Sequence, residues 1–107
     1  MNTLTVDLNR LAGPVFSGRN RGAAARQEYN LDQAEEQADV IQVVIPDSTY
    51  TVTSSFFLGL FGDSVRKCGS LSKFEKKFRY SAPDFLIPVL RGHASLALQN
   101  KKLFAQK

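Results

Sequence analysis

The fold of this chain is decided by residues 40–69, VIQVVIPDSTYTVTSSFFLGLFGDSVRKCG. Residues 40–45 are almost all β-branched, and this run ends at Pro46. After three consecutive hydroxyl residues at 53–55, the sequence becomes strongly apolar. A β-branched run such as that at residues 40–45 is typical of a central parallel strand that is covered on both faces. The apolar part predicts a helix from about residue 54 to residue 68, with Gly69 as its C-cap.

Upstream of this segment, strand and helix patterns follow one another. Leu4 and Val6 alternate with polar residues and predict an opening strand. Gly13 and Pro14 are expected to turn the chain ahead of a short extended piece. Helical spacing over residues 17–38 then predicts one helix on the outside of the fold, with Ser17 as its N-cap.

Downstream, residues 73–80 alternate again and predict a strand with Phe74, Phe78 and Tyr80 on one face. A last helix is expected from Pro83 to about residue 100, kinked or restarted near Pro88. The alternation of elements around a buried strand predicts an α/β layered domain with a mostly parallel sheet and about three helices.

Length and composition support a single domain. The chain has 107 residues, of which 43% are hydrophobic, so one globular domain over 1–107 is expected, with 101–107 as a frayed tail. Its one cysteine excludes an internal disulfide, and the sequence has no Cys/His pattern for a metal. The first residues lack the layout of a signal peptide, and no apolar run could span a bilayer. We therefore expect a cytoplasmic protein with no cofactor and no metal.

The charge is divided unevenly along the chain. Residues 1–63 carry 4 basic and 8 acidic side chains, whereas residues 64–107 carry 10 basic and 2 acidic ones. Such polarity could steer an acidic protein surface or a nucleic acid toward the second part. The alternative is a solvated face over 73–79 followed by a basic tail.

The helix expected over 54–68 has more apolar surface than packing on one sheet requires. Its apolar residues cover more than half of the circumference, whereas one contact needs a stripe of roughly 100°; they are Phe56, Phe57, Leu58, Leu60, Phe61 and Val65. Gly59 and Gly62 each cost about 1 kcal/mol relative to Ala in a helix, which suggests close approach of another backbone. The surplus fits a second packing neighbour, an exposed docking patch or a homodimer interface.

Thr53, Ser54 and Ser55 begin this helix and allow two interpretations. Thr53 or Ser54 can simply cap the helix. Alternatively, a phosphate on a serine would lie beside free backbone N–H groups and place about two negative charges next to an apolar docking surface.

Two stretches resemble a known family. The strand–loop–helix VVIPDSTYTVTSSFFLGLFG resembles STAS domains, and it is closer still to the STAS-like family of uncharacterised bacterial proteins. The stretch GPVFSGRNRGAAAR, with Phe16, Ser17 and Arg19, looks like the same family. The resemblance covers roughly residues 13–98 and implies a single STAS-like layered domain.

The resemblance also implies a function. In anti-sigma-factor antagonists, a D-S-S-G motif carries a serine that a partner kinase phosphorylates. Thr53 stands here in place of the aspartate, Ser54 matches the phosphoacceptor, Ser55 the second serine, and Phe56 replaces the glycine. The implied partner is a histidine-kinase-like ATPase or another signalling protein. The expected partner-binding surface is Asp47, Tyr50, Thr53, Ser54, Phe56 and Phe57, with Ser54 and Ser55 as candidate phosphoacceptors.

Other candidate residues carry weaker signals. Arg19, Arg21 and Arg26 could contact an anion or a partner, or form a solvated basic turn. His93 is expected to be a satisfied or surface histidine. Cys68 is expected to be an inert thiol, although the neighbouring Lys67 could lower its pKa.

These features bear on three possible functions. The leading one is a non-enzymatic regulatory protein-interaction module. The second is a small nucleic-acid-binding protein, which would use Lys73, Lys76, Lys77, Arg79 and the C-terminal lysines. An enzyme is not expected, because the sequence has no P-loop, G-x-S-x-G or H-E-x-x-H motif.

Overall fold

The computed structural model describes residues 2–10 and 15–105, and β3 (Val40–Val44) is the middle strand of its main sheet. The sheet has the order β1-β3-β5, with β1 at Thr3–Asp7 and β5 at Phe78–Ser81. Both neighbours run parallel to β3. The β-branched run therefore forms the central parallel strand that the sequence predicts.

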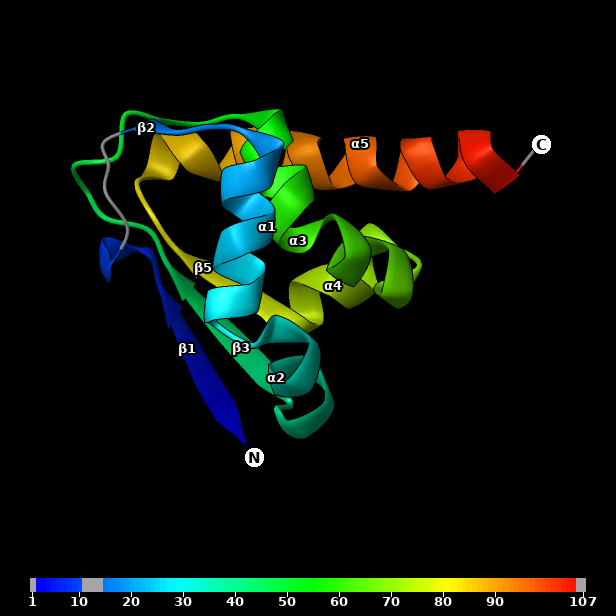
Figure 1. Cartoon of the computed structure of the whole chain (residues 1–107), viewed down its shortest axis with the longest axis horizontal. Helices are drawn as coiled ribbons and strands as arrows, with labels where there is room; N and C mark the ends of the chain where they lie inside the picture. The colour runs from blue at the N-terminus through cyan, green and yellow to red at the C-terminus, as the bar shows by residue number, and fades with distance from the viewer. Residues whose placement is uncertain (1, 11–14, 106–107) are drawn as a thin grey trace.

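Among the residues that the structure describes, the helices cover one face of this sheet (Figure 1). On the covered face, Ile41 and Val43 are fully buried and lie in register with Leu4 and Val6 of β1. On the other face, Gln42 is half-buried between exposed side chains of β1 and β5. The expectation that β3 is covered on both faces is wrong, because polar neighbours allow the second face to meet solvent.

A second, two-stranded parallel sheet immediately precedes two helices and places their first residues side by side. It pairs β2 (Val15–Phe16) with β4 (Thr51–Val52). The first strand leads into α1 (Arg19–Glu28), and the second leads into α3 (Ser54–Cys68). The helix expected over 54–68 is thus confirmed, and Gly69 ends it in the left-handed region at φ 83°.

Helices α1 and α3 pack at very close range through two glycines. A Cβ on Gly22 would overlap the carbonyl oxygen of Phe56, and a Cβ on Gly59 would overlap the carbonyl oxygen of Arg19. The predicted close approach at Gly59 is therefore made within the fold. At Gly62 the nearest atoms to a Cβ belong to the Arg66 side chain, so no backbone approaches there.

The helix expected over 17–38 is two helices. α1 begins after Gly18 with no side-chain cap, so Ser17 is not its N-cap. The helical conformation is interrupted at Asn30, whose φ of 52° lies in the left-handed region that asparagine tolerates. α2 (Leu31–Gln37) begins directly after this residue. The expected turn at residues 13–14 lies outside the described residues.

The strand expected over 73–80 is half helix. α4 (Leu71–Lys77) precedes β5, and the Ser70 hydroxyl caps it by accepting from the Lys73 N–H at 3.2 Å. Phe74 and Phe78 are four residues apart, a spacing that fits either period, and both are buried with their rings stacked at 4.7 Å. The N-cap at Ser70 favours the helical conformation for residues 71–77.

The last helix restarts where Pro88 predicted. A 3₁₀ turn, η2 (Asp84–Leu86), leads into α5 (Ile87–Ala105), which continues past the expected end near residue 100. A second 3₁₀ turn, η1 (Leu8–Arg10), follows β1. The described residues thus hold five α-helices rather than about three, in an α/β domain with parallel strand pairing. Its radius of gyration, 13.0 Å, is that of one compact domain of this length.

Candidate functional site

The start of α3 is held firmly by its neighbours. The Thr53 hydroxyl accepts from the Phe56 N–H at 3.2 Å, and the Thr53 N–H donates to the Phe16 carbonyl at 2.9 Å. Thr53 is therefore the N-cap, as one of the two interpretations predicted. Ser54 is half-buried and Ser55 is exposed, and the first turn of α3 contains no acidic residue.

Phe56 and Phe57 belong to the core. Their exposed fractions are 0% and 1%. The Phe56 ring lies 5.4 Å from Phe16, and the Phe57 ring lies 5.5 Å from Phe61. These two side chains therefore offer no surface to a partner in this conformation. Most of the surplus apolar surface of α3 packs against α1, α4 and α5. Of the three explanations for that surplus, packing against further elements of the fold is therefore the one that the structure supports.

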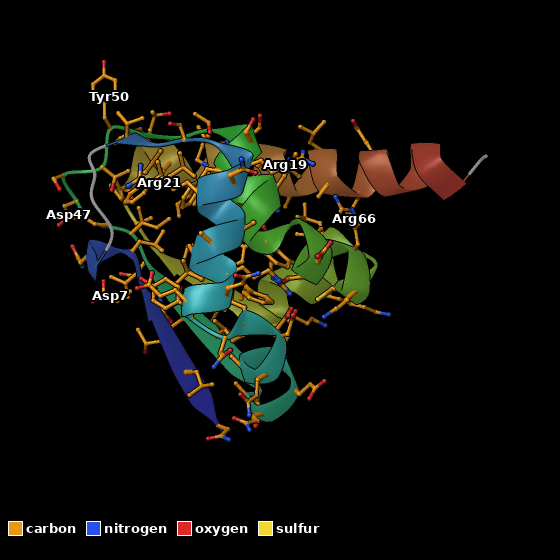
Figure 2. All side chains as sticks on the ribbon, viewed as in Figure 1. Asp7, Arg19, Arg21, Asp47, Tyr50 and Arg66 are labelled. Carbon is orange, nitrogen blue, oxygen red and sulfur yellow. The ribbon has the colours of Figure 1, made fainter. Side chains whose placement is uncertain are left out.

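The loop after β3 presents a different surface. Asp47 and Ser48 are exposed, and Tyr50 is 76% exposed and points away from the body of the protein (Figure 2). The Thr49 N–H closes a turn onto the Pro46 carbonyl at 3.0 Å. This loop lies at the carboxyl end of β3, the edge where α/β sheets usually meet their ligands.

Thr49 adds an unusual feature to this loop. Its side chain is 3% exposed, and its hydroxyl has no hydrogen-bond partner among the described residues. A buried hydroxyl without a partner is costly, so an unused hydrogen-bonding group lies between Asp47 and Tyr50.

The three arginines of the first helix do not form one site. Arg21 donates to the Val15 carbonyl at 3.0 Å and lies over the Phe16 ring, with 5.6 Å from its guanidinium carbon to the ring centroid. Arg19 is exposed at the start of α1 (Figure 2). Arg26 is 8% exposed and lies inside the fold. Only Arg19 is therefore placed to meet an anion in solvent.

Arg26 is the centre of a polar network that the sequence did not reveal. It donates to the Leu60 carbonyl at 2.9 Å and to the Ser64 hydroxyl at 2.8 Å, both in α3. It also donates to Asp32 at 2.6 Å and Glu35 at 2.9 Å, both in α2. The hydrogen bond and the charge of Arg26 lower the pKa of Asp32. The sequence signal was a single arginine in an otherwise small and apolar stripe of α1.

His93 and Cys68 have structural environments. His93 Nε2 lies 2.8 Å from the Val52 carbonyl, and its ring centroid lies 5.7 Å from that of Phe57, so it links α5 to β4. Burial, followed by the charge of Glu35, raises the pKa of the Cys68 thiol. The lowering that Lys67 suggested is not found, and a raised pKa disfavours the reactive thiolate.

The basic residues of α4 and β5 are placed unequally. Lys73, Lys76 and Arg79 are exposed. Lys77 is half-buried and donates to the carbonyls of Glu35 and Ala38 at 2.7 and 2.8 Å, so it caps α2. The side chains of the C-terminal lysines lie outside the described part of the chain.

Comparison with models of known families, with curated proteins and with solved structures finds no match to this chain. Within residues 2–10 and 15–105, no group of His, Cys, Asp and Glu is arranged to hold a metal ion. Every helix in the described part is too short or too polar to cross a membrane.

Proposed function

We propose that this protein is a cytoplasmic, non-enzymatic regulatory module with a STAS-like fold, resembling an anti-sigma-factor antagonist. It binds a signalling protein, of which a histidine-kinase-like ATPase is the leading candidate, through the loop Asp47–Tyr50 and the start of α3. The observation that carries the proposal is the 76% exposed Tyr50 beside a capped helix start that begins with Ser54 and Ser55.

Because Phe56 and Phe57 are buried, the proposed partner-binding surface is smaller than the sequence suggested. Tyr50 supplies the large apolar group of the surface, and Asp47, Ser48 and Ser55 supply exposed polar groups around it. An aromatic anchor with a polar rim is the usual anatomy of a protein interface. Phe56 and Phe57 support this surface from the core.

Phosphorylation of Ser54 would act as a switch on this surface. A phosphate there adds about two negative charges where the first turn of α3 has no acidic residue. The positive end of the helix dipole stabilises such charge within the fold, whereas an apolar partner contact is disrupted by it. The fold and the interaction should therefore respond in opposite directions.

The test is affinity capture from lysate of the native host, with wild-type, Ser54→Ala, Ser54→Asp and Ser72→Asp proteins as parallel baits. Ser72 is a matched control, because it is an exposed serine in the first turn of α4, which also contains no acidic residue. We expect an ATPase or signalling protein to be retained by all baits except Ser54→Asp. The Ser54→Asp substitution should meanwhile stabilise the fold by about 0.3–1 kcal/mol.

Equal recovery of the same partner on all four baits would refute the switch and leave the hydroxyls as part of a helix cap. A Tyr50→Ala bait then tests the surface itself. Undiminished capture by Tyr50→Ala would refute the proposed contact surface as well.

A further inference from the structure

A basic depression lies beside β5 and contains no residue of the loop Asp47–Tyr50. It has a volume of about 580 Å³ and is lined by residues of α4, β5 and α5: Leu71, Ser72, Glu75, Lys76, Arg79 and Arg91. Three of these side chains are basic and one is acidic, so the lining has a net charge of +2.

The charges of this basic depression are not all neutralised by the protein. Arg91 is paired with Glu75 through two contacts, Nε to Oε2 at 2.7 Å and Nη2 to Oε1 at 3.3 Å. Lys76 and Arg79 are exposed, and no carboxylate among the described residues forms an ion pair with either. The net charge is therefore available to a ligand.

The side chains also have suitable chemistry for an oxyanion. A guanidinium offers a planar pair of donors that matches phosphate geometry, an ammonium offers a compact charge, and the exposed Ser72 hydroxyl offers a further donor. A phosphate monoester carries close to two negative charges at neutral pH and a phosphodiester of a nucleic-acid backbone carries one, so the net positive charge of the lining attracts either group.

We propose that this basic depression binds a phosphate group, with Lys76 and Arg79 as the charged donors and Glu75 as a negative charge that weakens binding. None of the described residues that line the depression is aromatic, so they offer no platform for base stacking. The ligand is recognised by its phosphate, whether a small phosphorylated compound or a nucleic-acid backbone carries that phosphate. This inference is independent of the regulatory function proposed above.

The test is an NMR titration of the full chain, following backbone amide signals, with sodium pyrophosphate in one arm and a short single-stranded oligonucleotide in the other. We expect saturable shifts centred on residues 71–79 and 91. Affinity should fall steeply between about 50 and 200 mM salt. Tighter binding of the oligonucleotide identifies a nucleic-acid backbone as the source, and tighter binding of pyrophosphate identifies a small compound.

Three substitutions make the test specific. Arg79→Gln should weaken binding about five- to tenfold through loss of a charged donor. Glu75→Gln should strengthen it about two- to fivefold, because the net charge of the lining rises and Arg91 is released. Lys73→Gln is the matched control, since Lys73 is an exposed lysine of α4 outside the lining.

Two results would overturn the proposal. One is the absence of saturable binding in both arms. The other is an equal loss of affinity in Lys73→Gln and Arg79→Gln, which would show a diffuse response to positive charge. Because Arg79 is exposed, its substitution should leave the thermal unfolding midpoint unchanged, and this measurement confirms that the variant is folded.

Discussion

At the scale of single residues, two glycines set the distance between α1 and α3. Gly22 and Gly59 each face a carbonyl oxygen of the opposite helix, where even one methyl group has no room. Gly62 lies in the same helix as Gly59, but a methyl there would only touch the Arg66 guanidinium at 3.4 Å. The three positions therefore differ in what surrounds them, although they look alike in the sequence.

This difference gives a prediction for alanine substitutions. Gly59→Ala should lower the free energy of unfolding by at least about 2 kcal/mol, because two backbones would be forced apart. Gly62→Ala should leave it unchanged or raise it by up to about 1 kcal/mol through helix propensity. Urea denaturation of both variants measures the difference, and equal destabilisation of the two would contradict the close crossing.

At the scale of elements, the Arg26 network decides how α2 is held. α2 has only seven residues, too few for a stable helix on its own. Arg26 of α1 pairs with Asp32 and Glu35 of α2, and Lys67 of α3 approaches the same two carboxylates at 3.5 and 3.8 Å. Lys77 of α4 caps the last carbonyls of α2. This helix depends on polar contacts that come from three other elements.

Removal of the arginine should therefore be costly. Arg26→Met leaves the buried Glu35 carboxylate without its main partner, and we expect a loss of about 3–5 kcal/mol. Arg91→Met, the control, removes a solvent-exposed pair with Glu75, whose side chains are 56% and 31% exposed, and should cost less than about 1 kcal/mol. Chemical denaturation distinguishes the two. A loss below about 1 kcal/mol for Arg26→Met would show that the network does not stabilise the fold.

At the scale of the whole molecule, the sheet is covered on one side and flanked by two edge strands. β3 pairs along its length with both neighbours, whereas β1 pairs on one side and has three exposed residues. Cooperative stability is therefore centred on β3 and the covering face of α3.

Amide hydrogen exchange should follow this arrangement. We expect the slowest exchange in β3 and in the buried turns of α3, and faster exchange in β1 and the two-residue strands β2 and β4. Native-state exchange monitored by NMR measures it residue by residue. Protection of β1 equal to that of β3 would contradict the open edge and indicate that another chain pairs with it.

Much of this architecture was determined by local sequence alone. The β-branched run at 40–45 specified the central strand, the hydroxyls and Gly69 specified both ends of α3, and Pro88 specified the restart of the last helix. These features are predictable because caps, breakers and periodicity act over a few residues. The break at Asn30 and the helix at Leu71–Lys77 were missed, because local spacing there fits more than one structure.

Only the tertiary structure decided which of these residues face solvent and which face one another. Phe56 and Phe57 were expected on a surface but lie in the core, since α1, α4 and α5 converge on α3. Arg26 was a candidate either for an anion contact or for a solvated basic turn, but it is enclosed by two carboxylates from the next helix. The basic depression combines residues from three elements. These groupings cannot be predicted from local sequence, because burial and charge pairing depend on residues that are distant in the sequence and meet only when the chain folds.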